Sequence, residues 1–143
     1  MKPVSELVKT GPKQVVSVQA GDSVLDAIRV LAENDVGAVT VMEGERLVGM
    51  FSERDYTRKV VLQGRSSKDT LVSEIMSSPV ISVGPMTRTR ECMKLMTERN
   101  FRHLPVVEGG RVIGMVSIRD IIGDICAEQA FEIEQLEQYI HRS

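Results

Sequence analysis

The stretch GMFSERD occupies residues 49–55, and the similar stretch GMVSIRD occupies residues 114–120. Five of the seven residues are identical, and the two copies lie 65 residues apart. The same shift aligns VVSV at 15–18 with VISV at 80–83, and the match continues without a gap over roughly 50 residues. The chain is therefore a tandem duplication of one unit.

The segment that leads into each copy shows a different shift. VSEL at 4–7 aligns with VSEI at 72–75, which is a shift of 68 residues. The first copy therefore carries three additional residues, and these fall within 9–14. An insertion on one side of a duplicated fold makes the two halves unequal, so any two sites built from the repeat need not bind the same ligand.

Composition places the chain among globular proteins. Its 143 residues suit about one domain, and the hydrophobic (42%) and charged (27%) fractions are ordinary. The net charge of -2 lacks the basic character of a nucleic-acid-binding protein, and no apolar run is long enough to span a membrane. The two cysteines form no metal or redox motif, and the first residues lack the apolar core of a signal peptide. We therefore expect a cytoplasmic protein.

Local patterns give the same order of elements in both copies. In the first, a β-branched strand at 15–18 precedes a helix capped at Asp22 or Ser23, whose apolar residues recur at helical spacing. Strands at 38–42 and 47–51 follow around a glycine turn, and a helix begins near Ser52. The predicted order is β-α-β-β-α.

The second copy repeats this pattern. It is expected to have a strand at 80–83, a helix capped by Thr87, strands at 104–107 and 112–116, and a helix from Ser117. A hairpin with a helix on either side buries its apolar face poorly alone. Two copies can pack together around a shared core, which gives the duplication a structural reason.

These features together resemble the CBS (cystathionine-β-synthase-type) motif, and the pair resembles a Bateman module over about residues 4–126. The resemblance rests on VSEL, VSEIM, FRHLPVV at 101–107 and the Gly-x-x-Ser-x-x-Asp phrase. Thr40 departs from the pattern, because Pro105 stands at that place in the second copy. The resemblance implies an α/β (α+β) fold with pseudo-twofold symmetry: unit 1 at 1–68, unit 2 at 69–126, and a helical extension at 127–143.

The repeated phrase itself has two interpretations. Ser-x-x-Asp before a helix is a capping box, which requires no ligand, and Gly49 then serves only as a small residue beneath a crossing element. Alternatively, the helix N-terminus and Ser52 face a phosphate, while Asp55 accepts from both ribose hydroxyls. In the family, the residues matching Ser52, Asp55, Ser117 and Asp120 hold phosphate and ribose, so the resemblance favours nucleotide binding.

The resemblance also supplies the rest of a candidate site. Arg54 and Arg119 offset the carboxylates beside a phosphate, and Arg102 and His103 are expected to turn toward it. A solvated helix face for the arginines and a structural role for the histidine are the alternatives. The base is expected against the other copy's first strand, and two residues are expected at the cleft centre. These residues are Ser78, Pro79, Val80 and Ile81 for the Asp55 site, Thr10, Lys13, Val15 and Val16 for the Asp120 site, and Gly37 and Ala38 at the centre.

The sequence does not favour catalysis. The histidines His103 and His141 lie far apart, and no phosphate-binding glycine motif is present. The resemblance implies a regulatory module that binds AMP, ATP or NAD, senses energy state and acts on an unknown partner in trans. With no catalytic motif, we expect it to be non-enzymatic, and we expect no nucleic-acid or membrane partner. The alternative is an interaction scaffold whose clefts no longer bind ligand.

The last 22 residues or so predict a helix. Residues 121–142 contain no proline and one glycine, and an apolar stripe recurs at helical spacing, interrupted by Gln129. The stripe consists of Ile122, Cys126, Ile133, Leu136 and Ile140. Because the opposite face is acidic and rich in glutamine, we expect the stripe to contact a second copy in a homodimer. The alternative is that it folds back onto its own subunit.

Overall fold

The two copies of the repeat form two antiparallel hairpins with the same register. The computed structural model describes residues 2–11 and 15–142. In the first unit, β2 (Ala38–Glu43) pairs with β3 (Arg46–Ser52), and in the second, β4 (His103–Glu108) pairs with β5 (Arg111–Ser117). The pairing register of each hairpin shifts at the equivalent place, after Val41 in the first and after Val106 in the second. The predicted hairpins and their pseudo-symmetry are confirmed.

The first strand of each unit is shorter than the sequence suggests. β1 (Ser17–Gln19) pairs in parallel with β2, so the predicted strand at 15–18 begins two residues late. The strand predicted at 80–83 is wrong, because only Val83 forms a bridge, to Val106. Pro79 and Pro85 bracket this segment and cannot donate backbone hydrogen bonds, which limits how far it can pair.

The two longer helices within the units also correspond. In α1 (Val24–Asn34), the Ser23 hydroxyl accepts from the backbone N–H of Asp26 at 3.1 Å, as predicted. In α4 (Thr89–Arg99), the cap position is Arg88. The predicted cap at Thr87 is wrong, since its hydroxyl instead accepts from the backbone N–H of Gly84 at 3.0 Å and closes the preceding turn.

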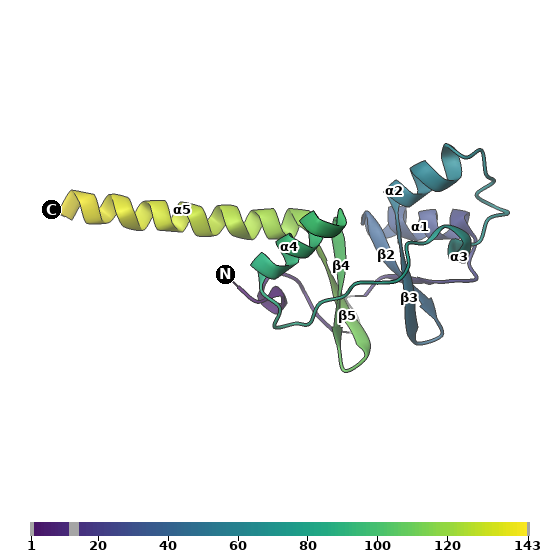
Figure 1. Ribbon diagram of the computed structural model, residues 1–143, viewed down its shortest axis with the longest axis horizontal. Coiled ribbons are helices and arrows are strands. Elements are labelled where there is room, and N and C mark those ends of the chain that lie inside the picture. Colours follow the sequence, from purple (N-terminus) through teal and green to yellow (C-terminus); the bar gives the residue numbers. More distant parts are fainter. Residues whose placement is uncertain (1, 12–14, 143) are drawn as a thin grey trace.

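The leading segment of each copy packs against the other copy. The short helix η1 (Val4–Glu6) places Val4 in the core of the second unit, and α3 (Val72–Ile75) places Val72 in the core of the first. Backbone hydrogen bonds fix both crossings, for example from Val4 to Thr87 and from Val72 to Asp22. The exchange joins the two units into one body (Figure 1).

Both repeats of the Ser-x-x-Asp phrase start a helix. The first starts α2 (Glu53–Tyr56), which continues as the π-helical turn η3 (Thr57–Val61). The second starts α5 (Ile118–Arg142), a single 25-residue helix. Ile121 anchors the first turns of α5 in the second core, and the rest of the helix projects away from the body (Figure 1). The alternative in which the terminal stripe folds back is therefore wrong.

Gly49 of the repeated phrase is needed for packing. A Cβ added there would lie 2.5 Å from Sδ of Met76 and 3.1 Å from the carbonyl oxygen of Ser77. We expect Gly49→Ala to lower the free energy of unfolding by about 1–3 kcal/mol, the usual cost of overpacking. Gly21→Ala is the control, because nothing lies within 4 Å of its added Cβ. Urea unfolding measures both, and equal stabilities for the two variants would contradict this role.

Candidate functional site

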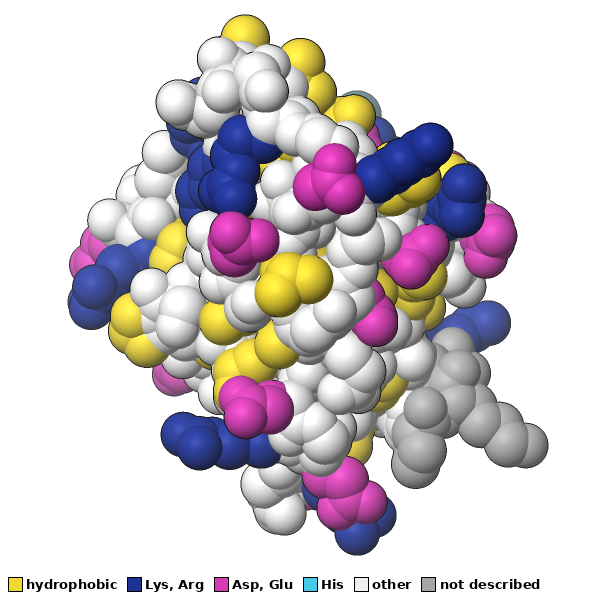
Figure 2. All heavy atoms as spheres, turned by 90° about the vertical axis from the view of Figure 1, so that its right-hand side faces the viewer, with side chains coloured by type: hydrophobic (Ala, Val, Ile, Leu, Met, Phe, Trp, Pro, Cys, Tyr) yellow, Lys and Arg dark blue, Asp and Glu magenta, His cyan; other side chains and the backbone are white. Residues whose placement is uncertain are grey.

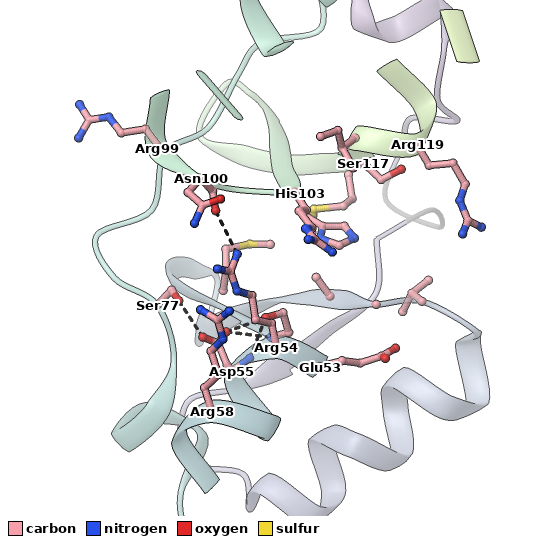
Figure 3. A pocket seen from close by; sticks show the side chains of 18 of the residues that line it. Glu53, Arg54, Asp55, Arg58, Ser77, Arg99, Asn100, His103, Ser117 and Arg119 are labelled. Carbon is pink, nitrogen blue, oxygen red and sulfur yellow. Dashed lines mark hydrogen bonds between the residues drawn. The ribbon is translucent and has the colours of Figure 1, made fainter. Parts of the chain in front are cut away.

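A cleft of about 890 Å³ lies where the two hairpins end and the helices α2 and α5 begin. Its lining follows the repeat, because many of the lining residues form pairs that lie 65 positions apart, one from each unit. The pairs include Asp35 with Asn100, Gly37 with Arg102, Met50 with Met115, Ser52 with Ser117, Arg54 with Arg119 and Asp55 with Asp120. The two copies of the phrase therefore meet at one site (Figure 3).

The capping box predicted for the phrase is present in both copies. Oδ2 of Asp55 accepts from the backbone N–H and the hydroxyl of Ser52, both at 3.0 Å. Oδ2 of Asp120 accepts from the same groups of Ser117, at 2.8 and 2.9 Å. Each serine hydroxyl also accepts from the backbone N–H of its aspartate. Capping explains why the phrase contains these residues, and it fixes both carboxylates at the cleft.

The cleft is more cationic than the chain as a whole. Six arginine and lysine side chains line it, against four aspartates and glutamates, whereas the chain carries a net charge of -2. The cations are Arg54, Arg58, Lys59, Arg99, Arg102 and Arg119. Arg54 reaches across the cleft, where its Nη1 donates to the carbonyl oxygen of Asn100 at 3.5 Å (Figure 3). This distribution of charge suits an anionic ligand.

His103 stands near the centre of the cleft, opposite Gly37. A Cβ added to Gly37 would lie 3.5 Å from Cε1 of His103, so glycine permits the close approach of the two halves. Burial lowers the pKa of His103 below its ordinary value, while the charges of Asp120 and Glu53 act in the opposite direction. The imidazole is therefore neutral at physiological pH.

The lowered pKa of His103 predicts how stability depends on pH. As the pH falls, the unfolded chain takes up a proton at a pKa of about 6.5, before the folded chain does, so the folded state loses stability. The loss continues until the pH passes the folded pKa. Thermal unfolding between about pH 7.5 and 5.5 should therefore show a smaller fall in Tm for His103→Gln than for the wild type. His141→Gln is the exposed control, and an unchanged pH dependence in His103→Gln would contradict the prediction.

The structure brings together part of the site expected from sequence. The lining includes ten of the expected residues, namely Gly37, Ala38, Ser52, Arg54, Asp55, Arg102, His103, Ser117, Arg119 and Asp120. It does not include Thr10, Val15, Val16, Ser78, Pro79, Val80 or Ile81, and Lys13 lies outside the described residues. Val16 and Ile81 instead pack against the cores of the first and second units.

Other lining residues were missed by sequence reasoning. Met115 and Ile118 belong to the second copy of the phrase, and Asn100 ends the helix before β4, 65 positions after Asp35. Extending the repeat argument to every position of the phrase and to the helix end before each hairpin could have found them. Arg58, Lys59 and Ser77 could not, because their presence depends on how α2 continues and where the segment after α3 crosses β3.

Neither cysteine resembles a nucleophile. Cys92 is buried in the second core, and burial raises the pKa of its thiol to about 11, with the charge of Glu91 adding to the effect. Cys126 is exposed on α5, and neither residue lines the cleft.

A comparison with known proteins identifies the family. The CBS domain model matches residues 4–62 and 72–126, so the chain belongs to the CBS-domain family and contains a tandem pair. It is 41% identical over 124 residues to the mitochondrial CBS domain-containing protein CBSX3 of Arabidopsis thaliana, covering 83% of this chain and 60% of that protein. The chain thus spans somewhat under two thirds of that relative.

Solved structures agree with the fold. A CBS-domain protein from Burkholderia ambifaria MC40-6 is 46% identical with a TM-score of 0.82, over 90% of this chain and 96% of that one. A CBS domain protein from Pyrobaculum aerophilum, solved in complex with AMP, is 30% identical with a TM-score of 0.73, over 82% and 88% of the two chains. The fold and site thus define a CBS-pair regulatory module.

Proposed function

We propose that this chain is a sensor of adenine nucleotides of the AMP, ATP or NAD class, which reports their level to a protein partner. The observation that carries the proposal is the single cleft in which both Ser-x-x-Asp phrases meet. Each phrase presents a helix start, a hydroxyl and a carboxylate, which are groups that suit phosphate and ribose.

The charge and size of the cleft support this proposal. Its surplus of cations over carboxylates suits phosphate, and its volume of about 890 Å³ lies in the range of small-molecule sites. The relative from Pyrobaculum aerophilum, which shares the fold over most of its length, was solved with AMP. Together these observations favour a nucleotide over an uncharged ligand.

A regulatory role suits these observations better than a catalytic one. The cleft contains a histidine with a lowered pKa but no cysteine. Within the described residues, the hydrogen bonds of the Ser52, Ser117 and Arg54 side chains cap the helices or cross the cleft, and none of them activates a nucleophile. We therefore infer that ligand binding itself, and not turnover, is the functional event.

Thermal unfolding with AMP, ATP, NAD and S-adenosylmethionine tests the proposal. A ligand at 100 times its Kd stabilises the folded state by about 2.7 kcal/mol, which raises the Tm of a chain of this size by several degrees. A shift with at least one of these ligands is expected. The absence of any shift at millimolar ligand would favour the alternative, a scaffold whose cleft no longer binds nucleotide.

The arginines of the phrase should act on the phosphate. Arg54→Ala and Arg119→Ala should each weaken binding of AMP by about 1–2 kcal/mol, because a charged hydrogen bond is lost, while binding of adenosine changes little. Arg111→Ala is the control, since this exposed residue begins β5 at the hairpin turn, outside the cleft lining. Calorimetry with both ligands measures the difference. Equal losses for AMP and adenosine would show that the arginines do not contact phosphate.

The projecting part of α5 supports a homodimer. Ile133 and Leu136 are 56% and 62% exposed, and no other described element covers them. They belong to a stripe whose positions alternate at spacings of three and four, the pattern of helices that pair, with Gln129 as its one polar position. The identical stripe of a second chain is the occupant that we propose.

Two further expectations concern partners and location. Figure 2 shows Lys and Arg side chains interspersed with Asp and Glu over the end face of the first unit, so that face is no basic surface for nucleic acid. None of the helices in residues 2–11 and 15–142 has the length and apolar character of a membrane span. A cytoplasmic location remains a prediction.

A further inference from the structure

The two carboxylates of the repeated phrase differ in their hydrogen-bond partners. Besides its two bonds from Ser52 to Oδ2, Asp55 accepts at Oδ1 from the hydroxyl of Ser77 at 3.1 Å and pairs there with Nζ of Lys59 at 3.1 Å. A carboxylate offers about four acceptor positions. Asp55 therefore has all of its acceptor capacity in use, and only 8% of the residue is exposed.

Asp120 has only half of its acceptor capacity in use. Its Oδ2 accepts from the backbone N–H and the hydroxyl of Ser117, as in the first copy. Among the described residues, no group donates a hydrogen bond to Oδ1 of Asp120. Asp120 is partly exposed and lines the cleft. It therefore retains acceptor positions at the cleft for a ligand that carries two adjacent donors.

The difference is encoded in the sequence. The residue four positions after Asp55 is Lys59, whereas the residue four positions after Asp120 is Asp124. Positions four apart share a helix face, so the second half has a carboxylate where the first has a cation. Asp124 is only 7% exposed, and its Oδ2 has no hydrogen-bond partner in the described part of the chain. The second half thus has an excess of acceptors over donors.

The leading segments add to the asymmetry. Ser77 reaches Asp55 because it follows α3 and bridges to Met50 of β3. In the second half, Lys9 and Thr10 lie at the corresponding place, against Gly114 of β5. Neither is hydrogen-bonded to Asp120. By the 68-residue shift of the leading segments, the position of Ser77 is occupied by Lys9, so the second half has no counterpart of the Ser77 hydroxyl.

We propose that the cleft holds one nucleotide per chain, with its ribose on Asp120, while Lys59 and Ser77 close Asp55 to a second one. This inference rests on the proposed function and specifies which half of the cleft serves it. The cis-diol of a ribose supplies two adjacent O–H donors, which match the vacant acceptor positions of Asp120. Binding at Asp55 would first have to displace two existing partners.

Calorimetric titration of the full chain with AMP and with 2′-deoxy-AMP tests the assignment. The wild type should bind one AMP per chain and should prefer AMP to 2′-deoxy-AMP. Asp120→Asn should weaken the affinity for AMP roughly 10- to 150-fold, which is the range for loss of a hydrogen bond to a charged group. It should also reduce the preference for AMP over 2′-deoxy-AMP. A merely structural effect of this substitution would weaken both ligands equally.

Two exchange variants test the cause of the asymmetry. The double variant Lys59→Met with Ser77→Ala should open Asp55 and raise the stoichiometry toward two AMP per chain. Asp124→Lys should place a cation beside Asp120, occupy its free acceptor positions and lower the affinity for AMP. Lys94→Met is the control, because this exposed lysine is paired in the same i,i+4 spacing, on α4.

The outcomes separate this inference from the proposed function. If the wild type binds none of the four test ligands, the proposed function fails. Two AMP molecules per wild-type chain, or loss of AMP binding in Asp55→Asn but not in Asp120→Asn, would overturn the assignment to Asp120 while leaving nucleotide binding intact.

Discussion

A chain that ends at residue 127 should sediment as a monomer at micromolar concentration, whereas the full chain should sediment as a dimer. The deleted segment is the part of α5 beyond the second core, whose last contributing residue is Ile125. The truncated chain therefore keeps both cores and should remain folded. A monomeric full chain would remove the dimer from the account, and a truncated chain that stays dimeric would show that another surface holds the pair.

Point substitutions in α5 locate the interface more sharply. Leu136→Glu places a charge within the apolar stripe and should dissociate the dimer. Phe131→Glu is the matched control, because Phe131 is 61% exposed but lies about 160° around the helix from Ile133. If the two substitutions dissociate the dimer equally, the stripe does not define the contact.

The second large effect concerns stability. Phe51 has no exposed surface and lies in the core of the first unit. Phe51→Ala should lower the free energy of unfolding by about 3–5 kcal/mol, since both transfer free energy and a cavity contribute. The free energy of unfolding of a typical domain is about 5–15 kcal/mol, so this loss would remove a large part of the stability.

Urea unfolding measures this loss as a lower midpoint at unchanged slope. Phe131→Ala serves as the control, because its side chain is mostly exposed, and it should cost under about 0.5 kcal/mol at a protein concentration that keeps the dimer saturated. Equal losses at the two positions would mean that the first unit lacks the core described.

The repeat made the fold predictable from sequence. Two copies of the same pattern allowed each hairpin and each helix start to be checked against its partner, and the box formed by Ser52 and Asp55 has the predicted partners. The segment around Val83 misled the prediction, because its β-branched residues suggest a strand. Its pairing is limited to one bridge between flanking prolines.

The site was less predictable than the fold. Residues of the phrase, such as Arg54 and Arg119, reach the cleft because the phrase sits at the strand-to-helix turn in both units. Ser77 and Lys59 were missed, although they determine which carboxylate has acceptor positions left. The contact of Ser77 depends on where the segment after α3 crosses β3, and that of Lys59 depends on α2 continuing as η3. Neither feature leaves a local pattern in the sequence.

The most direct test of the account is a crystal structure of the full chain grown with saturating AMP. The account predicts one nucleotide in the cleft between the two hairpins, with its ribose hydroxyls on Oδ1 of Asp120 and its phosphate among the arginines. A cleft that remains empty at saturating AMP, or a nucleotide bound elsewhere on the surface, would contradict the account.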